Sequence, residues 1–502
     1  MEELPDIGMP LGDAERVLEN ARIFAHVHRM QRLGTESLLA ALIADPTPEI
    51  AAALDALGVD IDRLQRMIDE FFVDLPGRRT TRVAEMGPTP RVKLVIKLAA
   101  QLARKHNESG LSPTRLFEAI HLETDSSGGQ MLARLSRRTS DELPHAHVGL
   151  HTTTDFRRAA KLKMDPVAFD YFASGADAQK LKKRNRRAWD ELEIRHRVLV
   201  NVADVDTSTE LLGLKLPFPA MIAPMAYQRL AHSEGELATA RAAAEAGVPL
   251  VVSTMANVTL EAIAAATSAP KWFQLYCHRD RRITEDLIRR AEAAGYRAIV
   301  VTVDAPVLGR RVADERNNFD LPEGLTRANL ARYEAKGGVD SGSELAELFR
   351  TRQDASLTWK DIEWFKSLTR LPILLKGVVR GDDAKRASDA GCAGLIVSNH
   401  GGRQLDASIA SARALPEVVA AVEDRIPVLV DGSIEWGADI LRALALGAKA
   451  VLIGRPVLWG LAVSGETGVK RVLDLYAEDF KRAMQLAGSP AVNDLGPDLL
   501  AR

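Results

Sequence analysis

The stretch GLIVSNHGGR, residues 394–403, joins a short apolar run to a group of polar residues and glycines. Its first half is aliphatic and partly β-branched, which is typical of a strand buried on both faces. Its second half places Ser398, Asn399 and His400 where that strand ends, and Arg403 follows two glycines. The stretch therefore predicts a buried parallel strand with ionisable side chains at its carboxyl end.

Seven further apolar runs of this kind occur between residues 221 and 454. Most are followed by alanine-rich helical segments such as residues 235–247, 284–295 and 435–447. Eight such strands alternating with helices predict an α/β fold, a closed parallel (β/α)₈ barrel; the alternative, a six-stranded doubly wound sheet, has too few strands. The expected strands are residues 221–226, 250–254, 272–277, 298–304, 373–378, 394–400, 428–432 and 450–454.

Residues 8–140 follow a different pattern, with apolar residues at helical spacing throughout. This region also repeats itself, which predicts two helical copies that bury their apolar faces against each other. One shift of about 78 residues aligns the two copies, matching Val17, Ala21, Leu38, Leu39 and Leu42 with Val95, Ala99, Leu116, Phe117 and Ile120.

We therefore expect an all-α repeat domain at residues 1–140, a linker at 141–154 and a barrel domain at 155–502. The linker contains His145, His147 and His151, which we interpret as solvated residues because their spacing is irregular. One connection in the barrel, residues 308–371, is much longer than usual and largely polar. Such a segment in a compact domain is typical of a lid, so we expect a partly mobile lid at about residues 312–356 over the active site.

Composition excludes several classes of protein. The 502 residues include 66 Lys and Arg against 68 Asp and Glu, a net charge of −2, which gives no electrostatic reason to expect a nucleic acid or membrane partner. Two cysteines, Cys277 and Cys392, make neither a disulfide framework nor a zinc site, and we expect no metal. The acidic N-terminus lacks a signal peptide pattern, so a cytoplasmic location is expected.

Polar or ionisable side chains occur at nearly every predicted strand end. Barrel enzymes place their active sites at the carboxyl ends of the strands, so we expect these side chains to meet in one site. The residues at these strand ends are Pro224, Met225, Ala226, Ser253, Thr254, Gln274, Tyr276, Thr302, Asp304, Lys376, His400, Asp431, Gly432, Ser433, Gly454 and Arg455.

The last two strand ends favour a phosphate. Gly432, Ser433 and Gly454 let a ligand approach the backbone, and the helices that follow present free N–H groups. Arg455 adds a bidentate donor. This pattern fits sugar-phosphate isomerases as well as flavin enzymes.

His400 is the best candidate for a catalytic base, because an imidazole titrates near neutral pH. Asp304 is placed to hold its ring, and Arg403 and Arg311 to bind a carboxylate. The alternatives are a buried structural histidine and solvated arginines. Lys376 ends an apolar strand, where a buried charge requires an anionic partner.

Residues 155–490 resemble the FMN-dependent 2-hydroxy acid oxidases and dehydrogenases, a family that includes glycolate oxidase, lactate oxidase and mandelate dehydrogenase. The resemblance covers the entire barrel, and its motifs are specific. They are residues 170–175 (DYFASG), 222–224 (IAP), 274–276 (QLY), 302–304 (TVD), 308–311 (LGRR), 375–378 (LKGV), 398–406 (SNHGGRQLD) and 454–456 (GRP).

The resemblance implies oxidation of a 2-hydroxy acid to a 2-oxo acid, with His400 as base, Asp304 beside it, and Tyr276 and Lys376 assisting. It places the substrate carboxylate against Tyr171, Arg403 and Arg311. Ala226 favours oxygen as the electron acceptor, and the family suggests a tetramer. The residues expected to contact FMN are Pro224, Met225, Ala226, Ser253, Gln274, Thr302, Lys376, Ser398, Asp431, Gly432, Ser433, Gly454 and Arg455.

Two positions depart from the family pattern. The family usually has Asp-Gly-Gly, an aliphatic residue and then Arg-Arg-Gly at the seventh strand, whereas this chain has DGSIEWG at residues 431–437. Glu435 thus replaces an arginine that usually binds phosphate, and a carboxylate there is expected to weaken FMN binding unless it turns away. Met255 occupies a pocket position that is often Trp, so the substrate is expected to be unusual.

The repeat domain resembles the N-terminal domain of Clp-type AAA+ chaperones, through residues 34–39 (GTESLL) and its two-copy design. No ATPase motif follows it, so we interpret it as a module that binds a peptide or protein. Three hypotheses result: an oxidase of a free small 2-hydroxy acid, a flavoenzyme whose N-terminal domain recruits a peptide- or carrier-borne substrate, and a non-catalytic scaffold that has lost FMN. The retained polar strand-end residues argue against the third.

Overall fold

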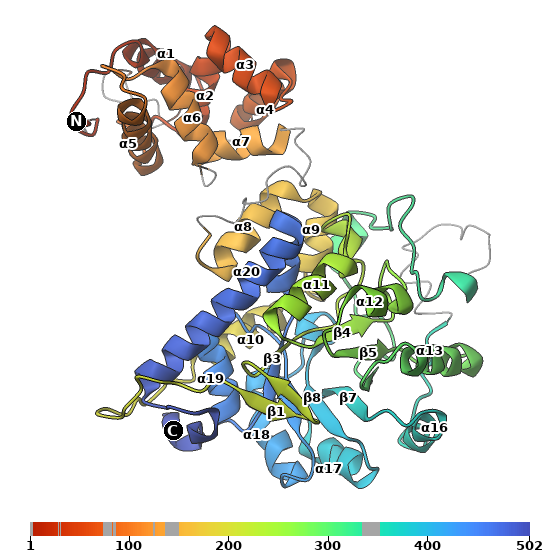
Figure 1. Cartoon of the computed structure of the whole chain (residues 1–502). Helices are drawn as coiled ribbons and strands as arrows, with labels where there is room; N and C mark the ends of the chain where they lie inside the picture. Colours follow the sequence, from red (N-terminus) through yellow and green to blue (C-terminus); the bar gives the residue numbers. More distant parts are fainter. Residues whose placement is uncertain are drawn as a thin grey trace. The chain divides into compact units, whose positions relative to one another are not determined.

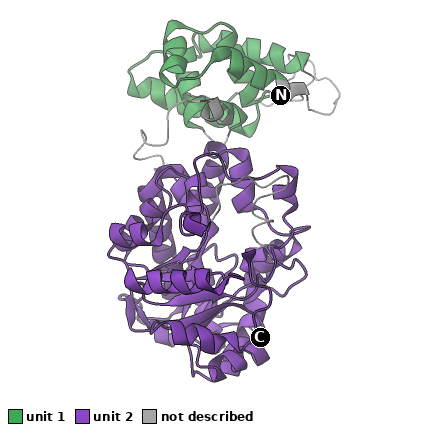
Figure 2. Cartoon of the chain, turned by 90° about the vertical axis from the view of Figure 1, so that its right-hand side faces the viewer, with its two compact units in different colours: residues 1–142 green, residues 143–502 purple. Residues whose placement is uncertain are grey.

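The computed structural model describes residues 4–28, 30, 32–73, 83, 87–123, 126–135, 150–333 and 352–501. Residues 141–149 of the expected interdomain linker and residues 334–351 of the expected lid lie outside this part. The chain divides into two compact units, residues 1–142 and 143–502 (Figure 2).

The first unit is a helical repeat (Figure 1). Val17 and Ala21 of the first copy are buried in one apolar core with Val95 and Ala99 of the second, as the sequence shift requires. Thr89 and Ser112 accept hydrogen bonds that cap the first two helices of the second copy, Pro90–Lys105 and Pro113–Leu122, each of which has a proline in its first turn. The helices are α1 (Ala14–Val27), α2 (Thr35–Ala44), α3 (Pro48–Ala56), α4 (Ile61–Val73), α5 (Pro90–Lys105), α6 (Pro113–Leu122) and α7 (Ser127–Leu135).

The second unit contains a closed barrel of eight parallel strands in the order β10-β3-β4-β5-β6-β7-β8-β9. The predicted barrel is confirmed, and each expected strand is present. Seven of the eight strands end one to four residues earlier than expected, because the last residues turn away from the ladder at the barrel mouth. The strands are β3 (Ala220–Ile222), β4 (Leu250–Ser253), β5 (Lys271–Leu275), β6 (Ile299–Thr302), β7 (Ile373–Val378), β8 (Gly394–Val397), β9 (Val428–Val430) and β10 (Ala450–Ile453).

A short antiparallel hairpin, β1 (Thr209–Leu211) and β2 (Leu214–Leu216), was not expected from the sequence. Its Leu211 and Leu216 belong to the same buried cluster as the side chains that fill the barrel interior, such as Met221, Val251 and Trp272. Because the hairpin immediately precedes β3, it packs at the end where the strands begin. The mouth at the carboxyl ends of the strands is left for the site.

Helices surround the barrel (Figure 1). Three of them precede it in sequence: α8 (Thr153–Lys163), α9 (Pro166–Ala173) and α10 (Lys180–Asp190). The others are α11 (Glu236–Ala246), α12 (Leu260–Ala266), α13 (Arg281–Ala293), α14 (Val312–Arg316), α16 (Asp361–Leu368), α17 (Gly381–Asp389), α18 (Ser411–Val422), α19 (Gly437–Ala445) and α20 (Arg455–Ala487).

Within the described residues, no single helix is long and apolar enough to cross a membrane, although α2 and α3 together pass the same test as a bent pair.

Candidate active site

A cavity of about 410 Å³ lies at the carboxyl ends of the barrel strands. Its wall brings together most of the residues that the sequence singled out: Tyr171, Pro224, Met225, Ala226, Ser253, Gln274, Tyr276, Thr302, Arg311, Lys376, His400, Arg403, Asp431, Gly432, Ser433, Gly454 and Arg455. Asp304 and Ser398 do not line it, but each bonds a residue that does.

His400 is aimed by a left-handed turn. Three successive residues, His400, Gly401 and Gly402, have φ values of 58°, 61° and 76°. The Ser398 hydroxyl accepts a hydrogen bond from the His400 amide at 3.0 Å, and the Asn399 side chain accepts one from the Gly402 amide at 3.2 Å. A Cβ at Gly402 would lie 2.9 Å from the backbone nitrogen of Lys182, so only glycine fits there.

The His400 ring lies between a carboxylate and a phenol. Its Nδ1 is 3.0 Å from Oδ1 of Asp304, and its Nε2 is 3.4 Å from the Tyr276 hydroxyl. Burial opposes ionisation of Asp304, but the charge and hydrogen bond of His400 together with Lys376 bring the Asp304 pKa below its ordinary value. An ionised Asp304 holds the ring proton on Nδ1 and leaves the Nε2 lone pair free to act as a base.

Burial lowers the pKa of His400 below 6.5, although Asp304 acts in the opposite direction. The imidazole is therefore neutral at pH 7, as a proton acceptor must be. Burial also raises the pKa of Tyr276, and the charge of Asp304 acts the same way, so the phenol keeps its proton.

Two arginines and an aromatic ring form a site for an anion. Arg403 donates to the carbonyls of Tyr171 and Ser174 at 2.6 and 3.0 Å, and its guanidinium lies 5.0 Å from the Tyr171 ring centre. Burial and the nearby Arg311 lower the pKa of Arg403 to about 9. Among the described residues, the buried Nε of Arg311 has no hydrogen-bond partner. A bound carboxylate would accept a hydrogen bond from Arg311 Nε and offset the repulsion between the Arg403 and Arg311 guanidinium groups.

Lys376 is 4% exposed and lies 2.9 Å from the Ser398 hydroxyl and 3.1 Å from Oδ2 of Asp431. Burial disfavours its charge, but Asp431 and Asp304 together raise the Lys376 pKa, so it carries a buried positive charge. The other oxygen of Asp431, Oδ1, is buried and has no partner within the described part of the chain. This edge of the cavity thus presents one fixed cation and one free acceptor.

The side-chain amide of Gln274 is held in one orientation. It donates to the Thr302 hydroxyl at 3.0 Å and accepts from the Ser253 hydroxyl and the Thr254 amide, both at 3.2 Å. These residues end β4, β5 and β6, so three neighbouring strands form one polar wall of the cavity.

Residues 160–502 match the model of the family described as FMN-dependent dehydrogenase, which is more than half of the chain. The chain belongs to this family. It is 48% identical over 352 residues to an L-lactate oxidase from Nostoc sp., which covers 69% of this chain and 96% of that protein. It is 44% identical over 349 residues to glycolate oxidase from Spinacia oleracea, with 69% and 94% covered.

Solved structures agree with this membership. Mandelate oxidase with (S)-4-hydroxymandelic acid is 45% identical, has a TM-score of 0.66, and covers 68% of this chain and 96% of its own. Outside the barrel, residues 12–135 match the Clp repeat N-terminal domain, which confirms the resemblance of the repeat region. The relatives named here match the barrel region and do not span the full chain.

In this FMN-dependent dehydrogenase, the predicted phosphate end of the cavity contains both donors and a carboxylate. Arg455 donates to the carbonyls of Phe172, Ser174 and Gly401, and burial lowers its pKa to about 10. Glu435 does not leave the cavity but forms part of its wall. Burial raises the Glu435 pKa, although Arg186 acts in the opposite direction.

Part of the cavity wall comes from α8 and α10 and was not expected from the sequence. These residues are Thr153, Thr154 and Arg157 on α8, and Lys182, Lys183 and Arg186 on α10. They precede the barrel, so no strand end marks them. The available signal was the dense basic run of residues 180–187, KLKKRNRR, which is unusual in a chain of balanced charge.

Proposed function

We propose that this chain oxidises a small 2-hydroxy acid to the corresponding 2-oxo acid, with FMN bound in the barrel cavity. The observation that carries the proposal is that a base, a phenol and two arginines face the same cavity. Nε2 of His400 faces the protonated hydroxyl of Tyr276, and Arg403 and Arg311 line the same cavity. A 2-hydroxy acid offers the matching groups, a carboxylate for the arginines and a hydroxyl on the adjacent carbon for the base. The relatives are named as oxidases of lactate, glycolate and mandelate, which are acids of this class.

The residues present fit FMN. Asp431 Oδ1 is a buried acceptor without a partner, and Lys376 is a buried cation on the same edge. A flavin carries both hydrogen-bond donors and acceptors, so it can pair with Asp431 and Lys376 together. This pairing would remove the free-energy cost of leaving the Asp431 acceptor buried and unsatisfied. FMN would supply a two-electron acceptor. The residues that would hold it are Pro224, Met225, Ala226, Ser253, Gln274, Thr302, Lys376, Ser398, Asp431, Gly432, Ser433, Gly454 and Arg455.

The chain's own residues bind and orient the substrate and move its proton. Arg403 and Arg311 bind the carboxylate, and the Tyr276 hydroxyl bonds the substrate hydroxyl. His400 Nε2 takes the proton that the substrate loses, and Asp304 stabilises the imidazolium that forms. Positioned proton transfer of this kind typically contributes roughly 10²–10⁴-fold to the rate.

The visible spectrum of the purified protein tests the proposal first. Bound flavin, or uptake of added FMN, is expected; a protein that neither contains nor binds FMN is the scaffold of the third hypothesis. Anaerobic bleaching of the bound flavin by lactate, glycolate and mandelate then tests the reaction. A His400→Gln variant that still binds FMN but bleaches at least about 10²-fold more slowly is the matched control.

Oxygen is the electron acceptor that we propose. Ala226 lines the cavity, and the relatives named above are oxidases. Stoichiometric hydrogen peroxide from each turnover supports oxygen, whereas slow reoxidation in air and fast reoxidation by a quinone would assign the enzyme to the dehydrogenases.

A second candidate function gives the repeat domain a role in recruiting a peptide- or carrier-borne substrate. Its support is the match of residues 12–135 to the Clp repeat domain. Flavin bleaching by free acids should be compared in the full chain and in a chain that starts near residue 150. The same comparison is made with a hydroxy acid carried on a peptide. Equal rates of the two chains with both kinds of substrate favour a free small substrate, and a loss of activity in the shortened chain only toward the peptide-borne acid favours recruitment.

We also propose that the chain forms a homo-oligomer, with a tetramer suggested by the family. Val198 and Leu199 are 71% and 103% exposed, and Leu486 is 71% exposed, which are apolar side chains of the kind that subunit interfaces cover. Light scattering of the purified chain tests this, and a monomer at micromolar concentration would contradict it.

A further inference from the structure

One end of the barrel cavity is unusually rich in cations. Arg157 of α8, Lys182 of α10 and Arg455 of α20 line it together with the turn that contains Glu435. The charges of Arg455, Arg157 and Arg403 all act on Lys182. Glu435 acts on Lys182 in the opposite direction, but the Lys182 pKa is still lowered overall, so an anion bound among these cations would stabilise the charged lysine.

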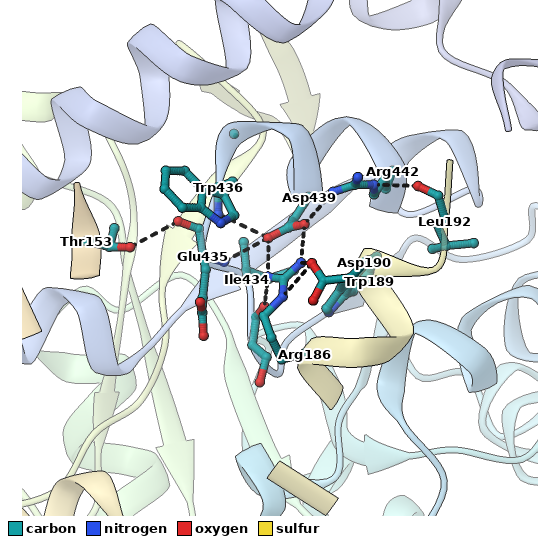
Figure 3. A network of polar contacts seen from close by, with 12 residues as sticks. Thr153, Arg186, Trp189, Asp190, Leu192, Ile434, Glu435, Trp436, Asp439 and Arg442 are labelled. Carbon is teal, nitrogen blue, oxygen red and sulfur yellow. Dashed lines mark hydrogen bonds and ion pairs between the residues drawn. The ribbon is translucent and has the colours of Figure 1, made fainter. Parts of the chain in front are cut away.

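Arg186 is not available for that anion. Its guanidinium forms two bonds with Asp439, at 2.6 and 2.8 Å, and also bonds Asp190 and the Ser433 carbonyl (Figure 3). Asp439 is equally committed, because it also accepts from Arg442 and from the backbone amides of Glu435 and Trp436. This closed network holds the turn between β9 and α19 in place.

The network fixes the backbone of Glu435, but the Glu435 carboxylate takes no part in its hydrogen bonds. The Glu435 amide donates to Asp439 at 3.0 Å, and its carbonyl accepts from the Thr153 hydroxyl at 3.2 Å. Figure 3 shows the carboxylate pointing away from Asp439, with no dashed line to it. A carboxylate held at the cavity wall in this way opposes any anion that binds beside it.

Lys182 is the cation best placed for an anion in the cavity. It is half-buried, and its Nζ donates to the Ala173 carbonyl at 2.5 Å, which, among the residues that the structure describes, leaves two of its three protons for a ligand. Burial, with the repulsion of Arg455 and Arg157, lowers the Lys182 pKa to about 8, which an anionic ligand would reverse. The Lys182 backbone also packs on Gly402, beside the catalytic turn.

We propose that Lys182, assisted by Arg157, binds the phosphate of FMN in this chain, and that Glu435 weakens that contact. The inference rests on the proposed function, because it takes FMN as the ligand. It assigns phosphate binding to helices that precede the barrel, in addition to the β10 end with Arg455. The family's usual arginine is Glu435 in this chain, and the positive charge that is lost there is thus supplied by Arg157 of α8 and Lys182 of α10.

The test compares FMN with riboflavin, which has the same ring and ribityl chain but no phosphate. Flavin-free protein is titrated with each, and quenching of flavin fluorescence gives the two dissociation constants. The variants are Lys182→Met, which keeps the aliphatic stem, Arg157→Gln and Glu435→Gln. Lys180→Met is the matched control, because Lys180 is an exposed lysine of the same helix outside the cavity wall.

Lys182→Met is expected to weaken FMN binding by about 10- to 100-fold, the usual effect of losing a hydrogen bond to a charged group. The same substitution should leave the riboflavin dissociation constant unchanged. Lys180→Met should change neither the FMN nor the riboflavin dissociation constant. Arg157→Gln should give a smaller loss of the same kind. Glu435→Gln should tighten FMN binding by about 3-fold or more without affecting riboflavin.

Two results would overturn the inference. One is an unchanged ratio of FMN to riboflavin affinity in Lys182→Met, and the other is an equal loss of both, which would make Lys182 a structural residue. Riboflavin binding itself shows that a variant is folded. A wild-type chain that binds neither flavin contradicts the proposed function as well, whereas FMN binding that is indifferent to Lys182 contradicts the inference alone.

Discussion

Gly377, the fifth residue of β7, lies directly against Asp304, the residue whose carboxylate contacts the His400 imidazole. A Cβ at Gly377 would be 2.4 Å from the Cβ of Asp304 and 2.9 Å from its backbone nitrogen. The φ of Gly377 is 112°, which disfavours any other residue. The position of the carboxylate beside His400 therefore depends on a glycine one strand away.

Gly377→Ala is expected to lower kcat by about 10²-fold or more, because it pushes Asp304 away from the ring. It should also lower the free energy of unfolding by about 1–3 kcal/mol through overpacking and strain. Gly295→Ala is the matched control: its φ is 77°, but nothing lies within 4 Å of the added carbon. That variant should lose about 1 kcal/mol of stability and no activity. Equal effects of the two substitutions on kcat would contradict the role given to Gly377.

The pH dependence of the reaction should follow His400. The base works only when neutral, and burial places its pKa below 6.5, so kcat/KM should be constant near pH 7 and fall as the pH drops through that pKa. Asp304→Asn removes a charge that raises the His400 pKa, so the acid limb should move to lower pH. The plateau should fall by at least about 10²-fold, because the imidazolium loses its partner. An acid limb centred above pH 6.5 in the wild type would be inconsistent with this.

The barrel and most of the cavity wall were predictable because they follow from local pattern. An apolar run fixes a strand, the carboxyl ends of parallel strands meet at one mouth, and residues such as Gln274, Lys376 and His400 stand at those ends. The pairing of His400 with Asp304 is a consequence of the same rule, although 96 residues separate them.

The contributions of α8 and α10 were not predictable in this way. The Thr153 hydroxyl bonds the Glu435 carbonyl across 282 residues, and no sequence period marks such a contact. The hairpin of β1 and β2 was missed because strands of three residues are too short to show alternation. The compensation of Glu435 by Lys182 and Arg157 was likewise not predictable, because these residues lie on helices that precede the barrel and their charges interact with Glu435 only in the folded chain.

Lys376 and Asp431 form a buried pair whose separation should be costly. Lys376→Met leaves the buried Asp431 without its cation and is expected to lower the free energy of unfolding by about 3–5 kcal/mol. Adding Asp431→Asn should restore part of that loss, because the remaining side chain is neutral. Urea unfolding of flavin-free protein measures both effects, since bound FMN would add stability of its own. Simple additivity of the two single substitutions would show that the pair is not coupled.

Arg403 should confer the preference for a carboxylate over a neutral group. A guanidinium binds a carboxylate through two charged hydrogen bonds, but an amide offers it a single neutral acceptor. The wild-type chain should therefore act on lactate with a kcat/KM far above that for lactamide. Arg403→Met should reduce kcat/KM for lactate by about 10²-fold or more and lactamide by much less, so that the preference narrows.

Arg311→Met should narrow the same preference to a smaller degree, because Arg311 already has Asp314 at 3.9 Å as a second charge. Steady-state kinetics with the two substrates measure the preference, and flavin content controls for loss of the cofactor. If Arg403→Met lowers kcat/KM equally for lactate and lactamide, Arg403 does not select the substrate. It then supports the fold of the cavity through its bonds to the Tyr171 and Ser174 carbonyls. A larger effect at Arg311 than at Arg403 would make Arg311 the main partner of the substrate carboxylate.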